Sequence, residues 1–212
     1  MATKLGVWNL ALVDLGHRRL SDTGEAVEAG RELTSVYDQV VAECLAAASW
    51  NFAMETIKAV SDTGVTPNFG YPEVFAKPSD WVRTYAVSQD ENFALPLLYY
   101  YDDANFWSAD SSPIYVRYVS NDTGLGRDLT RWPAAFTRYV ELELAARLSP
   151  RLTASESLRD RIAKERDKAR KSAKNQDAMN EPNPKFPPPS SWTAARSGGT
   201  GRERGSRGSL TG

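Results

Sequence analysis

Hydrophobic positions in the first fifty residues recur at steps of three and four. Over residues 4–16 this stripe predicts a helix, and Gly16 is well placed to end it. Asp22 and Glu25 have the spacing of a capping box, and the stripe behind them predicts a second helix over residues 23–48. The chain therefore begins with two helices, the second of them long.

The pattern changes after Trp50, where Gly, Pro, Asn and Asp separate short runs rich in β-branched and aromatic residues. These runs predict a small antiparallel β-unit over residues 50–120. The consecutive tyrosines at 99–101 would send aromatic surface to both faces of a strand, so we expect one face to meet another layer or another subunit. The predicted strands cover residues 52–60, 81–87, 95–101 and 114–119.

Helical spacing returns in the last third of the chain. Pro133 suits a first helical turn, and residues 133–149 predict a third helix that Pro150 ends. Thr153 and Glu156 have capping-box spacing and predict a fourth helix over residues 153–178. Its apolar stripe is thin, so we expect this helix to project into solvent or to dock on a partner.

These elements predict an α+β fold, in which a helical bundle of about four helices carries an inserted small antiparallel β-unit and an extended C-terminal arm. Residues 1–178 form the folded domain. Residues 179–212 form an extended tail rich in Pro, Gly and Arg, a composition that cannot bury a core of its own. Its two aromatic residues, Phe186 and Trp192, are suited to insertion into a groove of a partner.

Charge is unevenly distributed along the chain. The net charge is −1, but residues 151–212 hold 14 Lys or Arg against 7 Asp or Glu, so a net +7 follows a net −8. A dipolar subunit of this kind can dock on a neighbouring copy, or place a basic arm on an acidic partner or on nucleic acid.

Few residues point to chemistry. The single cysteine, Cys44, excludes an intrachain disulfide framework and a zinc site built on paired cysteines. It lies on an apolar helical stripe, where a small core residue is expected. The only histidine, His17, is followed by Arg18 and Arg19 and is interpreted as structural. No cofactor or metal is implied.

Carboxylate pairs are the remaining catalytic candidates. A glycosidase holds two carboxyls roughly 5 to 9.5 Å apart across a cleft. Asp102 and Asp103 are adjacent and diverge in an extended chain, whereas Glu141 and Glu143 lie about 200° apart on a helix. The glycines at 124 and 126 are too few for a dinucleotide fingerprint. We expect a protein that is not an enzyme.

The chain also lacks targeting signals. Its longest uncharged runs are far shorter than the roughly 18 to 20 apolar residues that span a bilayer, and no signal-peptide pattern precedes them. A soluble protein made in the cytoplasm is expected.

Three local sequences carry a resemblance to a known family. They are Trp-Asn-Phe at residues 50–52, Lys-Pro-Ser-Asp-Trp-Val-Arg at 77–83, and Ile-Tyr-Val-Arg-Tyr-Val at 114–119, the last followed by an acidic loop and Trp-Pro-Ala-Ala-Phe at 132–136. In their order and spacing, residues 4–178 resemble the head-to-tail adaptors of tailed bacteriophages, also called tail tubular protein A or head-tail connectors.

The resemblance implies a structural protein of the virion, assembled in the host cytoplasm and located between head and tail. Such a protein forms a ring of about twelve copies that docks on the portal protein and closes the head after genome packaging. The ring presents a platform for the tail tube or nozzle protein. Packaged DNA passes through its channel without sequence-specific contacts, and neither a cofactor nor a membrane is involved.

The resemblance also implies two sets of partner-binding residues. The portal is expected to contact residues 153–212. The candidates there are Leu158, Ile162, Arg166, Arg170, Phe186, Trp192, Arg196, Arg202 and Arg204. The tail side or a neighbouring subunit is expected to contact the aromatic residues of the β-unit. These are Trp81, Tyr99, Tyr101, Phe106 and Trp107.

Two other functions stay open. The Arg/Gly-rich tail is typical of sequence-tolerant nucleic-acid binding, so the chain could be a packaging accessory, which salt-sensitive DNA binding would reveal. Some adaptors of this kind have been proposed to cleave peptidoglycan. An enzyme of that class would show zymogram activity that is lost on changing a single acidic residue.

Overall fold

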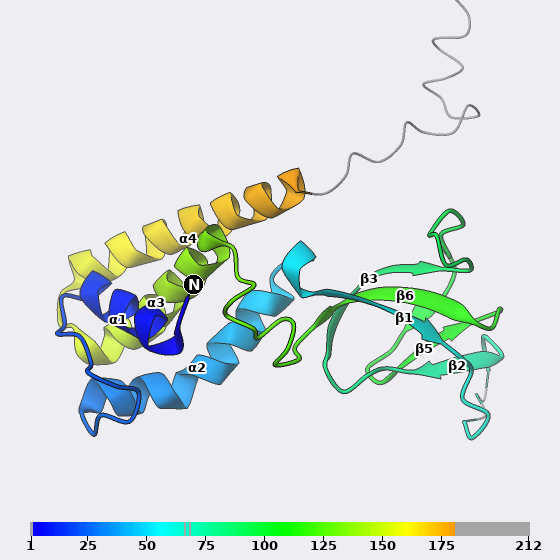
Figure 1. The fold of residues 1–212 in the computed structure, drawn as a ribbon, viewed down its shortest axis with the longest axis horizontal. Coiled ribbons are helices and arrows are strands. Elements are labelled where there is room, and N and C mark those ends of the chain that lie inside the picture. Colours follow the sequence, from blue (N-terminus) through cyan, green and yellow to red (C-terminus); the bar gives the residue numbers. More distant parts are fainter. Residues whose placement is uncertain (1, 66, 68, 181–212) are drawn as a thin grey trace, which may run out of the picture. The chain divides into compact units, whose positions relative to one another are not determined.

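The computed structural model describes residues 2–65, 67 and 69–180 (Figure 1). The chain divides into two units, Met1–Ala178 and Met179–Gly212. The helices and strands of the described residues lie in the first unit, apart from the last residue of the fourth helix. The extended arm and the other predictions on residues 181–212 lie outside the described residues.

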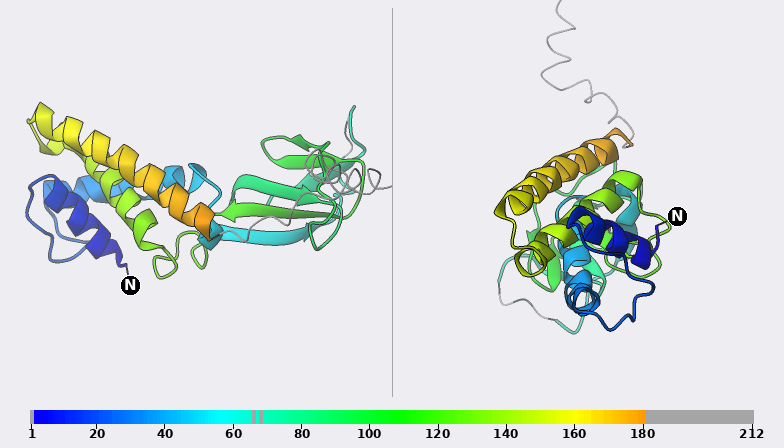
Figure 2. Two further views of the ribbon diagram at one scale, coloured as in Figure 1. Left: turned by 90° about the horizontal axis from the view of Figure 1, so that it is seen from above. Right: turned by 90° about the vertical axis from the view of Figure 1, so that its left-hand side faces the viewer.

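The described part of the chain has an α+β fold, as the sequence predicts. Its helices are α1 (Lys4–Asp14), α2 (Glu28–Ala46), α3 (Ala134–Leu152) and α4 (Glu156–Met179). A short 3-10 turn, Asn51–Ala53, leads from α2 into the β-unit. The strands are β1 (Met54–Ala59), β2 (Glu73–Ala76), β3 (Trp81–Ser88), β4 (Tyr101–Asp102), β5 (Phe106–Ala109) and β6 (Ile114–Ser120). Within the first unit, the helices group on one side and the strands on the other (Figure 2).

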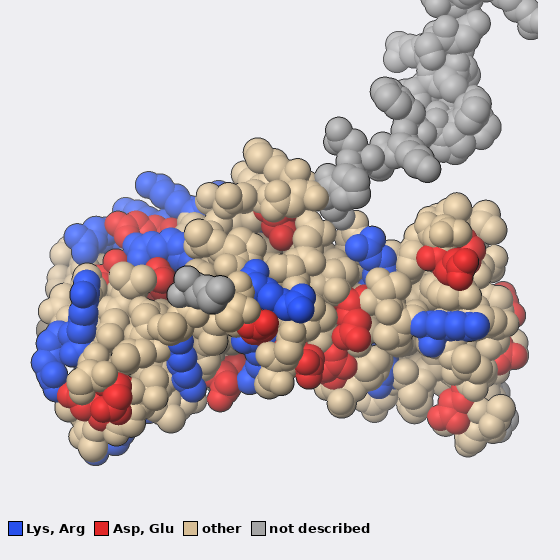
Figure 3. Space-filling view, viewed as in Figure 1, with Lys and Arg blue, Asp and Glu red and all other residues tan. Residues whose placement is uncertain are grey.

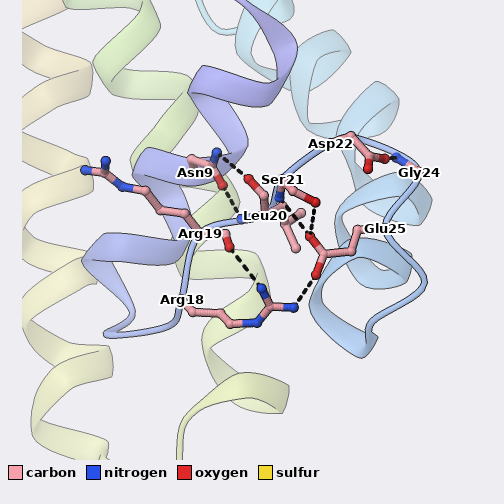
Figure 4. Close-up of polar contacts among 8 residues, drawn as sticks. All are labelled: Asn9, Arg18, Arg19, Leu20, Ser21, Asp22, Gly24 and Glu25. Carbon is pink, nitrogen blue, oxygen red and sulfur yellow. Dashed lines mark hydrogen bonds and ion pairs between the residues drawn. The ribbon is translucent and has the colours of Figure 1, made fainter.

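The loop between α1 and α2 explains why α2 begins later than predicted (Figure 4). The Glu25 carboxylate accepts hydrogen bonds from the backbone N–H and the hydroxyl of Ser21, at 2.7 and 3.0 Å, and pairs with Arg18. Glu25 therefore folds back on the loop and does not cap a helix, so the predicted capping box is wrong. The Asn9 side chain joins this loop to α1, because it exchanges two hydrogen bonds with the backbone of Leu20.

Helix α3 continues through Pro150, where the sequence predicts its end. A proline inside a helix lacks the N–H that would bond the carbonyl four residues back. Here the Ser149 hydroxyl donates a hydrogen bond to the Ala146 carbonyl at 2.9 Å, so this carbonyl keeps a partner. His17 then donates from Nε2 to the Leu152 carbonyl at 2.7 Å and satisfies the last turn of the helix.

Helix α4 packs on the helical core, although its sequence is polar. Ile162 and Ala173 are buried, and Leu158 and Ala169 pack against the same core cluster. The hydroxyl of Ser155 accepts a hydrogen bond from the Leu158 N–H, so Ser155 caps this helix, whereas the sequence pattern predicts the cap at Thr153. The thin apolar stripe is therefore used within the chain and does not project into solvent.

The β-unit contains two antiparallel sheets of three strands each, in the orders β1-β6-β3 and β2-β5-β4. Three predicted strands match β1, β3 and β6. The prediction over residues 95–101 is wrong, because only Tyr101 of that run lies in a strand and Pro96 lacks the N–H that a strand ladder needs. Strands β2 and β5 were missed, since four residues each are too few to show an alternating pattern.

Two hydrophobic clusters hold the first unit together. The larger packs all four helices and includes the buried rings of Trp8, Trp50 and Phe136. The smaller lies between the sheets and contains Phe75, Trp107 and Ala109 from one sheet against Ala59, Val87, Ile114 and Val116 from the other. The two sheets therefore pack face to face, and a chain that ends at Asn180 keeps both cores. No described helix is long and apolar enough to cross a membrane.

Candidate interaction surfaces

The β-unit exposes large apolar side chains on the chain segments around β4. We call this set the apolar surface. It contains Phe69, Leu95, Leu98, Tyr99 and Tyr101, which are 87%, 61%, 77%, 77% and 51% exposed. Scattered apolar residues are ordinary on protein surfaces, but a group of large ones in neighbouring segments is typical of an interaction site.

The loop that carries Leu95 and Leu98 is organised by one carboxylate. Asp90 accepts hydrogen bonds from the backbone N–H groups of Ala94 and Leu95, at 3.0 and 2.7 Å, and from the Ser88 hydroxyl at 2.8 Å. These bonds lower the pKa of Asp90, and the bond from Ala94 has the largest effect, followed by that from Leu95. The loop is therefore held in one conformation by bonds to the ionised form of Asp90.

The same loop contains a strained turn that is held by contacts to β6. Phe93 has a φ of 55°, in the left-handed region that a bulky residue rarely adopts. The Arg117 guanidinium lies 5.9 Å from the centre of the Phe93 ring and 5.6 Å from that of Tyr85. Packing on β6 thus stabilises a strained turn, and Leu95 and Leu98 are presented on a preformed loop.

We predict that Asp90→Ala opens this loop without unfolding the protein. Amide hydrogen exchange at Ala94 and Leu95 is expected to become faster by about tenfold or more, because both N–H groups lose their acceptor. Acid should also open the loop. Since the folded pKa lies below the unfolded value, the stabilisation is present above about pH 4 and is lost as the pH falls through the folded pKa. Glu91→Ala is the control on the neighbouring exposed carboxylate, and equal exchange in both variants would contradict the prediction.

A groove lies beside the apolar surface, on the β2-β5-β4 sheet. It has a volume of about 420 Å³ and is lined mainly by apolar side chains, with Phe69, Tyr101 and Phe106 as its aromatic residues. Tyr101 and Phe106 are sequence-predicted interface residues that the structure brings together here. Phe69, Leu95 and Leu98 were missed, although apolar residues within a Gly- and Pro-rich segment are a signal that sequence reasoning can use.

The two tryptophans predicted at the tail-side interface make contacts within the β-unit. Trp107 is 0% exposed and lies between the two sheets, so the expectation that it contacts a partner is corrected. The Lys77 ammonium lies 3.6 Å from the centre of the half-buried Trp81 ring and also pairs with Asp102. Both indole N–H groups donate to the Thr84 hydroxyl, at 3.1 and 2.9 Å. Together these contacts join the two sheets.

The portal-side candidates on α4 fall into two groups. Ile162 is 1% exposed, so it belongs to the core and is not available to a partner, and Leu158 packs against the same core. Arg166 pairs with Glu143 and Asp167. Arg170 is exposed and lines two grooves, one on α4 itself and one that α4 forms with α3 and the end of α2. The remaining candidates, Phe186, Trp192, Arg196, Arg202 and Arg204, lie outside the described residues.

The face of α4 that points away from the core is basic. Arg161, Lys164, Lys168 and Lys171 recur at steps of three and four and are all exposed. Figure 3 shows basic side chains gathered along this helix, next to acidic ones. The face is thus a narrow cationic ridge between residues 161 and 171.

Most of the groups weighed for catalysis are tied into the fold by their side chains. Burial raises the pKa of the Cys44 thiol, which keeps it protonated. Burial also raises the pKa of Glu141, whose carboxylate lies 3.3 Å from the Arg138 guanidinium. Glu143 pairs with Arg166, and Asp102 with Lys77. Among the described residues, no group of three His, Cys, Asp or Glu could hold a metal ion.

No protein-family model matches this chain, and no curated protein matches it.

Proposed function

We propose that the protein is a structural head-to-tail adaptor of a tailed bacteriophage. In this role a ring of about twelve copies docks on the portal, closes the filled head and receives the tail. The order of elements supports the proposal, because a helix, a long helix, a β-unit and two further helices follow one another as in the family that residues 4–178 resemble. The uneven charge also supports it, since a basic C-terminal segment suits docking on another subunit.

The apolar surface is the observation that carries the proposal. Its side chains are too exposed to serve the fold of a single chain, and Asp90 and Arg117 hold the loop of Leu95 and Leu98 in place before any partner binds. A preformed apolar surface loses little conformational entropy on binding, which favours stable association with a partner. In the adaptor, this surface contacts the tail or a neighbouring copy. Arg170 and the tail beyond residue 180 contact the portal.

Mass measurement with the portal protein of the same phage tests the proposal. The full-length chain is expected to form a complex whose mass corresponds to a ring on the portal. A chain that ends at Asn180 keeps both cores but is expected to bind at least about tenfold more weakly, because it lacks the basic tail. A full-length Leu98→Asp variant should still bind the portal and should fail to recruit the tail protein or a neighbouring copy.

Failure of the full-length chain to associate with the portal, at any ratio, would overturn the proposal. Equal binding by the chain ending at Asn180 would remove the tail from the portal contact and leave the helices to make it. Glu91→Ala serves as a control for the Leu98 variant, because it changes an exposed side chain of the same loop.

The cationic ridge of α4 favours a second candidate, a nucleic-acid-binding packaging accessory. Lys164, Lys168 and Lys171 present three positive charges on one helical face, and the tail adds further arginines. In this case the free chain binds DNA with an affinity that falls steeply as salt rises. Changing the three lysines to glutamine should then reduce the slope of the salt dependence of DNA binding. If the protein is an adaptor that needs no DNA contact, the same change should leave its binding to the portal unaltered.

A further inference from the structure

Positively charged side chains from two elements gather where the second half of α4 meets the β1-β6-β3 sheet. Ala173 of α4 and Val119 of β6 are buried in the same core cluster, and Val82 of β3 packs against that cluster. Lys174 follows Ala173 on α4, and Arg83 follows Val82 and lies opposite Val119 in the antiparallel register. The start of β3 and the second half of α4 therefore adjoin the same part of the core.

The charges of Arg83 and Arg170 both reach Lys174, and we call these three residues the cationic cluster. Burial has the largest effect on the pKa of Lys174, which it lowers, and the positive charges of Arg170 and then of Arg83 lower it further. Arg170 precedes Lys174 by four residues, so their side chains are neighbours on one face of α4. Three positive charges from a helix and a strand thus repel one another at one place.

The cationic cluster has no acidic partner in the part of the chain that the structure describes. None of its three members forms an ion pair among these residues. Two acids of the same half of α4 are engaged elsewhere. Asp167 pairs with Arg166, and the Asp177 carboxylate accepts a hydrogen bond from the backbone N–H of Asn51 at 3.1 Å. The repulsion within the cluster is a cost that a bound anion would remove.

A groove on α4 gives an anion access to the cationic cluster. It has a volume of about 370 Å³ and is lined by Asp167, Arg170, Lys171 and Lys174. This volume lies within the range of roughly 300 to 1,000 Å³ that is typical of small-ligand pockets. Lys171 is exposed and adds a further positive charge at the rim, whereas the charge of Asp167 is balanced by Arg166.

The side chains of the cluster suit a phosphate group. Arginine and lysine are the usual protein donors to phosphate, and their charge-assisted hydrogen bonds are stronger than neutral ones. A phosphate ion or a phosphate monoester presents at least three free oxygens, so each of the three cations can bind one of them. A carboxylate presents only two, as does a phosphate in a nucleic-acid backbone, and either would leave one cation without its own acceptor.

We infer that Arg83, Arg170 and Lys174 form a binding site for a phosphate ion or for the phosphate group of a monoester. The phosphate lies in the groove on α4, with Lys171 at its rim. The inference goes beyond the proposed function, and it depends neither on a portal nor on DNA.

Titration calorimetry of the full-length chain with sodium phosphate, at constant ionic strength, tests the inference. Saturable binding of one phosphate ion per chain is expected. Lys174→Met and Arg83→Gln should each weaken it by about tenfold or more, because each removes a charge-assisted hydrogen bond. Lys168→Met is the matched control. It makes the same change at an exposed lysine of α4 that does not line the groove, and it should leave phosphate binding unchanged.

Thermal melting without phosphate separates a binding defect from a folding defect. Because both changes relieve repulsion within the cluster, neither variant should melt at a lower temperature than the parent chain. A variant that melts earlier and also loses phosphate binding would show that its side chain supports the fold, and would remove that residue from the site.

Two further ligands separate the sources of phosphate. Competition by glycerol 3-phosphate would show that the site accepts a monoester, and a lack of competition would restrict it to the free ion. An oligothymidylate without terminal phosphates should bind the parent chain and Lys174→Met equally, because its backbone phosphates lack the third free oxygen. The inference is overturned if phosphate does not bind saturably, if Lys168→Met weakens binding as much as Lys174→Met, or if the cluster variants weaken binding of the oligonucleotide alone.

Discussion

Gly126→Ala is expected to destabilise the protein by about 3 kcal/mol or more. A Cβ at this position would lie 1.9 Å from the carbonyl oxygen of Ser120 and 3.0 Å from its carbonyl carbon. These are backbone atoms at the end of β6, so they cannot turn aside as a flexible side chain would, and overpacking of this kind costs at least about 1 to 3 kcal/mol. The Gly126 carbonyl also accepts the Trp132 indole N–H at 2.9 Å, so a shifted loop disturbs a buried tryptophan. Urea unfolding measures the loss, and the melting temperature should fall by about 6 to 12 °C.

Gly124→Ala is the matched control for this prediction. The nearest atom to a Cβ at Gly124 is a side-chain oxygen of Asp122 at 3.2 Å, and this oxygen can move. The change is expected to cost less than about 0.5 kcal/mol. If the two alanine variants unfold at the same urea concentration, the loop has room to move away from β6 and the close contact is not required.

The two glycines also show where sequence reasoning ends. The Gly-Leu-Gly run at residues 124–126 indicates a loop, and the structure has a loop there. The requirement for glycine at 126 depends on how closely this loop passes the Ser120 carbonyl, which no local pattern encodes. The same limit applies at Glu25 and at Ser155. Which residue caps a helix depends on where the incoming chain turns, and that is decided by packing against α1 and α3.

The strands were predicted less completely than the helices, for a related reason. A long helix repeats its apolar period several times, whereas β2 and β5 have four residues each. Aromatic residues in short strands therefore indicate a β-unit but not which side is covered. Tyr99 and Tyr101 are exposed as expected, while Trp107 is buried because a second sheet lies over it.

The second large effect is expected at the junction between the helical core and the β-unit. Phe136 on α3 is 1% exposed, and its ring centre lies 4.8 Å from that of Trp50, 4.7 Å from that of Phe52 and 5.0 Å from that of Trp132. The chain enters the β-unit after Trp50 and Phe52, which precede β1, and returns to the helices at Trp132, which follows the loop after β6. We call these two connections the chain crossings. The Phe136 ring packs on both of them. Phe136→Ala is expected to lower the free energy of unfolding by about 3 to 5 kcal/mol, because it leaves a cavity among three aromatic rings.

Phe69→Ala removes the same atoms from a ring that is 87% exposed, and it should change stability by less than about 0.5 kcal/mol. Amide exchange in the Phe136→Ala variant then shows whether the loss of stability is confined to α3 or shared with the β-unit. Since this residue contacts both chain crossings, exchange is expected to become faster in β1 and β6 as well as in α3, by a similar factor. Faster exchange confined to α3 would mean that the β-unit holds its structure without the helices, and the aromatic cluster would then be a contact between two independent cores. A shared response would instead show that the helical core stabilises β1 and β6 of the β-unit, through Phe136.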